Sequence, residues 1–236
     1  GLESGVVVKF NNTHHIRVNG ILDMQGTSDN PVVFTSWKDD SAGGDTNNDA
    51  DTTVPSPGDW YYIDIRNSEN VWKHCEFRYG GYNNGSMLSI TSSSPTIEQC
   101  TFANARGAAI YVSDGSPQIK DNVIRESHRG ITIYGTSSGT PASRPVISGN
   151  TITENGLPLS LEGYAFPVFS NNTLTNNAIR SIGVSGSMDP SATRSEIWPK
   201  LDIPYMVNGS FTVGSKMTLG LESGVVVKFN NTHHIR

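Results

Sequence analysis

A short acidic run, DTNNDAD at residues 45–51, has the residue types and spacing best suited to a chemical role. Oxygen donors at every second position allow one tight loop to direct several ligands at a single hard cation, as the first half of an EF-hand loop does. The spacing therefore predicts a calcium site whose first ligands are Asp45, Asn47, Asp49 and Asp51. The alternative interpretation is a solvated acidic turn that binds no metal.

The run departs from the EF-hand pattern at two positions. Ala50 stands where the EF-hand has the Gly of its sharp turn, and Ser56 stands where it has the bidentate Glu. We expect the missing ligand to come from another aspartate of the same stretch: Asp39, Asp40 or Asp59. The stretch from Trp37 to Trp60 has almost no apolar residues, so it predicts one long acidic loop that leaves the core.

The elements that must position this loop are short strands. The 236-residue chain has 24 Gly, 12 Pro and only 17% charged residues, a composition that favours strands joined by turns over helices. Between Val6 and Phe34, apolar residues alternate in strand-length bursts that Gly, Asn or Asp terminate. Such bursts fit sheets with one face in a core and the other in water.

From residue 71 onward, five segments share one frame: NVWKHCEF, SPTIEQCTF, SPQIKDNVI, RPVISGNTI and FPVFSNNTL. One column of this frame has spacings of 25, 22, 28 and 22 residues and contains Cys75, Cys100, Asn122, Asn150 and Asn172. Apolar residues fill the column three residues before it and the column two residues after it. A period of about 22–28 residues with two or three short strands predicts one coil of a parallel β-solenoid, and the fold class is therefore all-β.

In stacked coils, equal columns lie above one another at a spacing of about 4.8 Å. We therefore expect the Cys/Asn column to form a structural ladder in which Asn side chains hydrogen-bond along the solenoid axis. The same stacking brings the Cα atoms of Cys75 and Cys100 to about 5 Å, a distance that permits a disulfide. Two buried free thiols are the alternative, because Cys is among the most buried residue types.

In three coils, a second strand begins with Gly: GSMLSI, GAAIYV and GITIYG. We align these strands with Leu88, Ile110 and Ile133 facing one way. Tyr111 and Tyr134 then face outward, one coil apart, because side chains alternate along a strand. The pair predicts either a platform on which a glycan stacks or an aromatic ladder without a ligand.

The segment GLESGVVVKFNNTHHIR at residues 1–17 returns unchanged at residues 220–236, an offset of 219 residues. An identical return of this length predicts a tandem array, in which residues 1–219 form one period and residues 220–236 begin the next. We expect residues 1–236 to form a single continuous β-solenoid.

The five-segment pattern resembles the right-handed parallel β-helix proteins, a class that includes pectate lyases and the periplasmic copper-insertion β-helix proteins. The segment from VNGILDMQG through the acidic run to PSPGDW resembles a module of large secreted and cell-surface repeat proteins of bacteria and archaea. These resemblances imply a right-handed parallel β-helix and an extracellular or cell-surface location.

The interpretation that joins these features is an extracellular structural protein. Copies of it would join end to end, either as covalent tandem repeats or as separate subunits that donate strands to one another. They would form a stiff fibre, stalk or filament for adhesion or for surface and biofilm architecture. One alternative is an adhesin module that binds glycans or cell surfaces, and the other is a polysaccharide lyase or hydrolase. The carboxylates outside the acidic run are scattered, so we expect no enzyme activity. A net charge of −5 without a Lys/Arg cluster argues against nucleic acid, and no apolar stretch is long enough to insert into a membrane.

Overall fold

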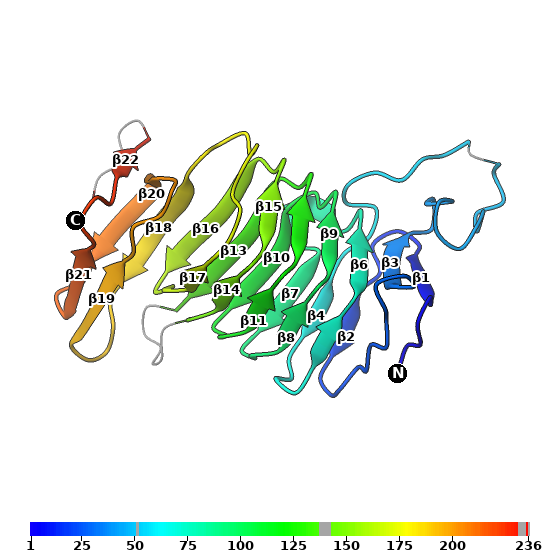
Figure 1. The fold of residues 1–236 in the computed structure, drawn as a ribbon, viewed down its shortest axis with the longest axis horizontal. Helices are drawn as coiled ribbons and strands as arrows, with labels where there is room; N and C mark the ends of the chain where they lie inside the picture. The colour runs from blue at the N-terminus through cyan, green and yellow to red at the C-terminus, as the bar shows by residue number, and fades with distance from the viewer. Residues whose placement is uncertain (51, 137–142, 231–234, 236) are drawn as a thin grey trace.

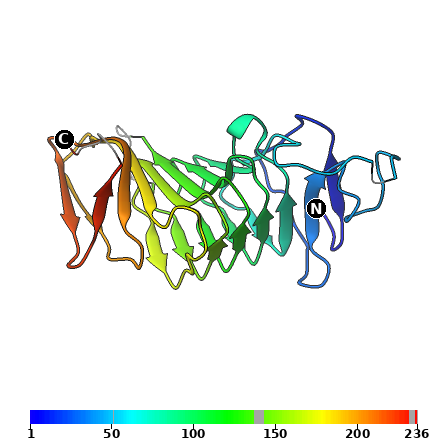
Figure 2. The ribbon, with the colours of Figure 1, turned by 90° about the horizontal axis from the view of Figure 1, so that it is seen from above.

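The computed structural model describes residues 1–50, 52–136, 143–230 and 235. These residues wind into an elongated β-solenoid, with the first and last coils at opposite ends of the rod (Figure 1, Figure 2). Within this part of the chain, every pair of hydrogen-bonded strands is parallel. The prediction of an all-β parallel solenoid is therefore confirmed.

The largest sheet takes one strand from each coil and has nine strands, so the described chain makes about nine coils. In hydrogen-bonding order, its strands are β2 (Ile16–Val18), β4 (Ile63–Ile65), β7 (Leu88–Thr91), β10 (Ala108–Ser113), β13 (Arg129–Gly135), β16 (Leu157–Gly163), β18 (Ile182–Met188), β20 (Tyr205–Val213) and β22 (Val227–Phe229). Alternate residues of these strands face the core, because successive side chains of a strand point to opposite faces of the sheet.

Two more sheets close the cross-section through most of the rod. The six-stranded sheet contains β1 (Val7–Phe10), β3 (Val32–Ser36), β6 (Cys75–Arg78), β9 (Thr101–Ala103), β12 (Val123–Arg125) and β15 (Thr151–Thr153). The five-stranded sheet contains β5 (Val71–Lys73), β8 (Thr96–Glu98), β11 (Gln118–Lys120), β14 (Val146–Ser148) and β17 (Val168–Ser170).

Toward the C-terminal end, the other sheet is a pair formed by β19 (Arg194–Trp198) and β21 (Met217–Leu221). A single short 3-10 helix, η1 (Tyr82–Asn84), is the helical element among the described residues. No apolar helix that could cross a bilayer occurs in the described ranges.

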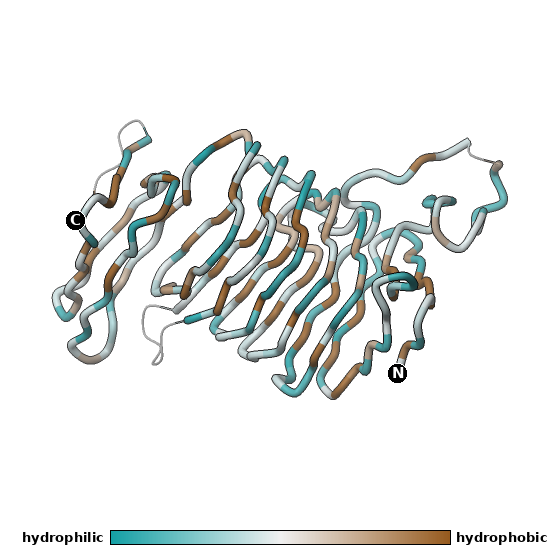
Figure 3. Tube along the Cα trace, in the orientation of Figure 1, coloured by the Kyte–Doolittle hydropathy of each residue, from teal (hydrophilic) through white to brown (hydrophobic). Residues whose placement is uncertain are grey.

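The core is a set of apolar columns that run along the rod. The inward column of the six-stranded sheet is fully buried and contains Phe34, Phe77, Phe102, Ile124 and Ile152. The rings of Phe34 and Phe77 stack 5.0 Å apart, and those of Phe77 and Phe102 stack 4.7 Å apart. Apolar and polar residues alternate along the chain of each coil (Figure 3), so each strand contributes one face to this core.

The Cys/Asn column lies at the corner between the five-stranded and six-stranded sheets. The Cys100 backbone N–H donates to Asn122 Oδ1 at 2.9 Å, and the Asn122 N–H donates to Asn150 Oδ1 at 3.0 Å. The Asn150 N–H donates in turn to Asn172 Oδ1 at 3.0 Å, and the Cys75 N–H donates to Cys100 Sγ at 3.4 Å. All five residues thus form one ladder along the axis.

A second ladder, absent from the sequence interpretation, lies at the corner between the six-stranded and nine-stranded sheets. Its members are Ala105, Ser127, Asn155 and Asn177. Each backbone N–H donates to the side chain of the next member, at 3.0, 3.0 and 2.9 Å. Each member stands five residues after a member of the first ladder, and this fixed offset is the sequence signal that reveals it.

The residue before each member of the first ladder adopts a left-handed backbone conformation. The φ angles are 50, 55, 53, 68 and 53° for His74, Gln99, Asp121, Gly149 and Asn171. This conformation turns the chain sharply and directs the following side chain into the corner. Only one of the five positions has Gly, the residue for which a positive φ costs least.

The structure corrects one predicted alignment in the nine-stranded sheet. Ile110 pairs with Leu88 on one side and with Ile131, rather than Ile133, on the other. The coil is therefore two residues shorter there than predicted. As a result, Tyr111 lies beside Thr132, while Tyr134 lies beside Ser113 and Glu162.

The two copies of the seventeen-residue segment adopt different pairings. In the first copy, β1 pairs with β3 in the six-stranded sheet. In the second copy, β22 pairs with β20 in the nine-stranded sheet, although its residues Val227–Phe229 are identical to Val8–Phe10. The same letters therefore occupy different faces of the solenoid.

Candidate functional site

The long acidic loop between β3 and β4 projects away from the rod (Figure 1). At its first end, the buried Asp39 carboxylate accepts hydrogen bonds from Thr35 Oγ1 and Ser41 Oγ, both at 2.5 Å, and pairs with Arg78 at 3.3 Å. Burial acts to raise the pKa of Asp39, but the hydrogen bonds from Ser41 and Thr35 and the Arg78 charge outweigh it and lower the pKa. Asp39 is thus an ionised anchor for the loop.

Asp59 anchors the other end of the loop. Its Oδ2 accepts hydrogen bonds from Ser36 Oγ at 2.8 Å and from the Ser56 N–H at 3.0 Å, and its Oδ1 pairs with Lys38 Nζ at 3.0 Å. Protein donors thus contact both carboxylates, and the two residues position the loop in this structure. The expectation that Asp39 or Asp59 supplies the missing ligand stays a prediction.

Three carboxylates converge in the middle of the loop. One oxygen from each of Asp40, Asp45 and Asp49 lies within 4.8 Å of the other two. Such a group can hold a hard cation such as calcium, which prefers oxygen ligands. The structure thus brings Asp40 to the predicted run, whereas Asp51 lies outside the described residues.

The backbone of the run holds the Asp45 carboxylate in place. Asp45 accepts hydrogen bonds from the Asp49 N–H at 3.2 Å and from the Ala50 N–H at 3.0 Å. The Ala50 hydrogen bond is the main cause of a lowered pKa for Asp45, so the group stays ionised to lower pH than usual. Ala50 has a φ of 50°, the left-handed conformation that glycine adopts in the EF-hand turn.

Asn47 lies against the carboxylate cluster. Its Nδ2 donates to Asp49 Oδ2 at 2.7 Å and to Thr53 Oγ1 at 2.8 Å. Its Oδ1 is shielded from solvent and has no hydrogen-bond partner among the described residues. A carbonyl oxygen beside three carboxylates adds a neutral donor of the kind that calcium sites use.

A second candidate site is a hollow of about 390 Å³ on the outer face of the nine-stranded sheet. Aromatic, hydroxyl and charged side chains from several coils line it, among them Tyr61, Tyr62, Tyr111, Arg129, Thr132 and Glu162. Thr132 is 3% exposed, and its Oγ1 has no hydrogen-bond partner in the described part of the chain. A buried hydroxyl without a partner favours a polar ligand group in the hollow.

The rings beside this hollow form a contiguous aromatic surface. The centroids of Tyr61 and Tyr62 are 4.9 Å apart, and Tyr62 stacks on His15 at 4.9 Å. Tyr82 extends the group, with its ring 5.7 Å from that of Tyr61. Burial raises the pKa of the Tyr111 phenol, and the Glu162 charge raises it further.

The predicted glycan platform is only half present in this hollow. Tyr111 lines it, but Tyr134 is not among the residues that line it. The shorter coil places Tyr134 beside Ser113 and Glu162, so the two tyrosines are diagonal neighbours rather than members of one column. The sequence interpretation missed Tyr61, Tyr62 and Thr132, which one coil alone cannot bring together.

The two cysteines of the ladder are free and buried in the structure. The Cys75 Sγ donates to the Lys73 carbonyl at 3.3 Å, and the Cys100 Sγ donates to the Glu98 carbonyl at 3.3 Å. The contact with Cys100 and burial both raise the pKa of Cys75, which keeps it as a thiol. These thiols act as small core side chains at the start of the ladder.

Comparison with known families agrees with this architecture. The model of the right-handed β-helix region family matches residues 3–142 and residues 63–233, which together span almost the whole chain. The chain belongs to the right-handed β-helix family. Family membership gives the solenoid its right-handed sense but names no ligand or reaction. Comparisons with curated proteins and with solved structures find no significant match.

Proposed function

We propose that this β-helix chain is the building unit of an extracellular structural array, in which copies joined end to end form a stiff rod, stalk or filament. The observation that carries the proposal is the unchanged return of residues 1–17 at residues 220–236. A repeated mechanical role favours identical units, whereas distinct binding sites need distinct sequences. Adhesion or surface architecture is the use that fits a long rigid rod.

The environments of the two copies support end-to-end joining. Phe10 is 6% exposed and stacks on Trp60 with ring centroids 4.5 Å apart. The identical residue of the second copy, Phe229, is 48% exposed. In the first copy, β3 and Trp60 follow the segment in sequence and cover it, so a following unit would cover Phe229 in the same way.

Joining also removes the open edges of the sheets. An exposed strand edge has unpaired N–H and C=O groups that attract other strands. In an array, the last coil of one unit would pair with the first coil of the next, and β22 would move from the nine-stranded to the six-stranded face. One 219-residue unit contributes eight strands to the nine-stranded sheet, β2 to β20, because β22 belongs to the next unit. Eight coils at about 4.8 Å give each unit a length of roughly 40 Å along the rod.

Electron microscopy of the native material, together with the mass of the denatured chain, tests this proposal. We expect filaments with an axial repeat of roughly 40 Å, made of chains many times heavier than 25.5 kDa. Discrete particles with the mass of a single unit would contradict it.

We further propose that calcium stiffens the acidic loop by binding Asp40, Asp45 and Asp49, with Asn47 beside them. Three converging carboxylates repel one another, and a divalent cation removes that repulsion. In calorimetric titration, we expect Asp45→Asn to weaken calcium binding at least about tenfold, because it removes a charged ligand. Asp189→Asn, an exposed change outside the loop, is the matched control. Equal binding by both variants would contradict the site.

A second candidate function, glycan binding, is favoured by the hollow on the nine-stranded sheet. Tyrosine faces stack on the apolar faces of sugar rings, while Thr132, Arg129 and Glu162 offer hydrogen-bond partners to sugar hydroxyls. Screening against a glycan array would identify a ligand, and Tyr111→Ala should then abolish its binding. Tyr134→Ala is the control, because Tyr134 does not line the hollow. Release of shortened glycans would instead indicate a lyase or hydrolase.

A further inference from the structure

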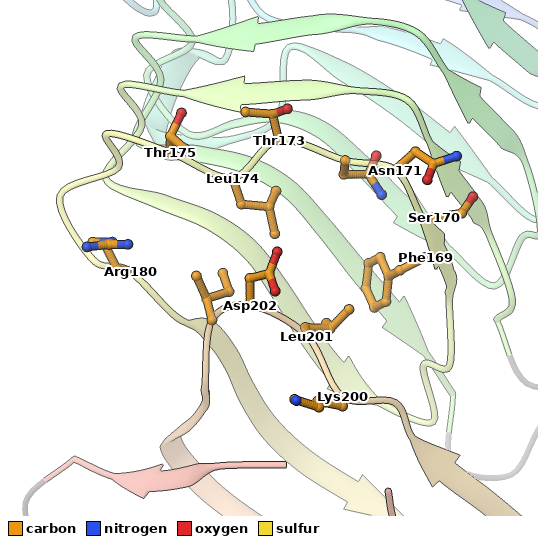
Figure 4. A pocket seen from close by; sticks show the side chains of 12 residues that line it. Phe169, Ser170, Asn171, Thr173, Leu174, Thr175, Arg180, Lys200, Leu201 and Asp202 are labelled. Atoms are coloured by element: carbon orange, nitrogen blue, oxygen red, sulfur yellow. The ribbon is translucent and has the colours of Figure 1, made fainter. Parts of the chain in front are cut away.

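The six-stranded sheet ends inside the rod, before the last coils. Its last strand is β15, and Thr173 of the next coil adds one isolated bridge to Thr151. Beyond Thr173 lies a groove of about 500 Å³. Residues 169–175 form one wall and residues 200–203 form the other (Figure 4).

Three earlier coils show what a complete coil provides at this position. The residue before the ladder donates its N–H to a carbonyl of the next coil: Gln99 to Lys120 at 3.1 Å, Asp121 to Ser148 at 3.0 Å and Gly149 to Ser170 at 3.0 Å. The ladder residue donates its N–H to the next Asn Oδ1, as Asn150 does to Asn172. Each coil thus offers the next coil the same two donors.

In the coil that borders the groove, these groups lack partners. The backbone N–H groups of Asn171, Asn172 and Leu174 make no hydrogen bond within the described residues. In the preceding coil, the equivalent Ile152 N–H donates to the Thr173 carbonyl at 2.8 Å. The edge is therefore a template for one more parallel strand that carries an Asn.

The chain's own next pass does not fill that place. Residues 199–204, PKLDIP, have a proline at each end and no Asn, and they make no backbone hydrogen bond to residues 171–174. Proline cannot donate an N–H to a sheet ladder, so this sequence is unsuited to become the missing strand. The groove is the resulting gap.

The groove combines this edge with apolar and charged walls. Phe169, Leu174 and Leu201 supply apolar surface. Arg180 lies at the Thr175 end and Lys200 at the opposite end, and neither side chain has an ion-pair partner among the described residues (Figure 4). A cation at the Thr175 end, where a parallel strand would finish, suits an acidic residue near the C-terminal end of an incoming segment.

We propose that the groove binds an extended segment of a partner polypeptide, which adds a parallel strand to the six-stranded sheet. The segment has the pattern Asn-x-apolar followed closely by an acidic residue. Its Asn Oδ1 accepts the Asn172 N–H, and its carbonyl two residues earlier accepts the Asn171 N–H. The carbonyl just after its Asn accepts the Leu174 N–H. Main-chain bonds supply affinity in strand addition, and the side-chain pattern supplies specificity.

The test is titration of the folded chain with a capped peptide of sequence VISGNTITEN, which copies residues 146–155. Amide exchange measured by NMR should show new protection at Asn171, Asn172 and Leu174. A peptide with Leu in place of its Asn should bind about tenfold more weakly, because the Asn172 donor then stays unpaired.

Two protein variants sharpen the test. Leu174→Pro removes one template donor and should weaken binding about tenfold; thermal unfolding checks that it is folded. Arg180→Glu, an exposed change, should weaken binding roughly threefold, whereas Arg194→Glu in β19 should leave it unchanged. Absence of binding at millimolar peptide, equal binding of both peptides, or protection only at the end strands β1 and β22 would each overturn the proposal.

Discussion

Each buried Asn of the ladder replaces interactions that a sharp corner removes from the backbone. Asn150 Nδ2 donates to the Ile119 carbonyl at 2.8 Å and to Asn172 Oδ1 at 3.0 Å. Its Oδ1 accepts from both the N–H and the Nδ2 of Asn122, at 3.0 and 2.9 Å. One side chain thus satisfies polar groups of the coils on both sides of it.

Replacing this residue should be costly. We expect Asn150→Leu to lower the free energy of unfolding by about 3 kcal/mol, because it leaves buried groups of Asn122 and Ile119 without partners. Urea denaturation followed by circular dichroism measures the change. Gln118→Leu, on an exposed strand position, should change stability by less than about 0.5 kcal/mol. Equal effects would show that the ladder does not stabilise the corner.

The lowered pKa of Asp39 predicts that the stability of the folded chain depends on pH. Its pKa is lower in the folded chain than the usual 3.8. The unfolded chain therefore binds a proton more readily, so the stabilisation is complete above about pH 4 and is lost as the pH falls through the folded pKa. We expect Asp39→Asn to be less stable than the natural chain at pH 7 and to lose less stability on acidification. Urea denaturation between pH 2 and 7 measures the unfolding free energy of both proteins. An equal loss of unfolding free energy on acidification in both would contradict this role.

At the scale of elements, the repeating unit is a strand, a left-handed corner and a ladder residue. The first ladder could be predicted because Cys75, Cys100 and three Asn residues each have an apolar residue three positions before them and another two positions after them. The second ladder was harder to see because Ala105 and Ser127 share neither shape nor chemistry with Asn. The strand alignment failed at Tyr134 because apolar alternation has a period of two and tolerates a two-residue shift.

The corners give a prediction about backbone strain. Gln99 has a φ of 55°, a conformation that costs about 1 kcal/mol or more in a residue with a Cβ. We expect Gln99→Gly to raise the melting temperature, with a gain of up to about 1 kcal/mol in unfolding free energy. In contrast, Gln118→Gly at the start of β11, where the strand pairs with β8 and β14, should be destabilising by about 0.5–1 kcal/mol. Calorimetry compares the melting temperatures of the two variants. A loss of stability in both would contradict backbone strain at Gln99.

At the scale of the whole molecule, the sites depend on residues that the sequence separates widely. The hollow beside Tyr111 draws on residues from Tyr61 to Glu162, and the groove at Thr173 exists because a later pass lacks an Asn. Neither follows from a local pattern, since each requires the register of several coils. The acidic cluster was easier to predict from the sequence because Asp45 and Asp49 are close together in it. Asp40 was only one of three candidates for the missing ligand.

The central claim is that units continue one another as a single solenoid. Small-angle X-ray scattering of a chain with two complete units, residues 1–219 followed by residues 1–236, tests it directly against the single chain. We predict an increase of roughly 40 Å in the longest dimension with an unchanged cross-section, as for one continuous rod. A scattering profile of two rods joined by a flexible hinge would contradict it.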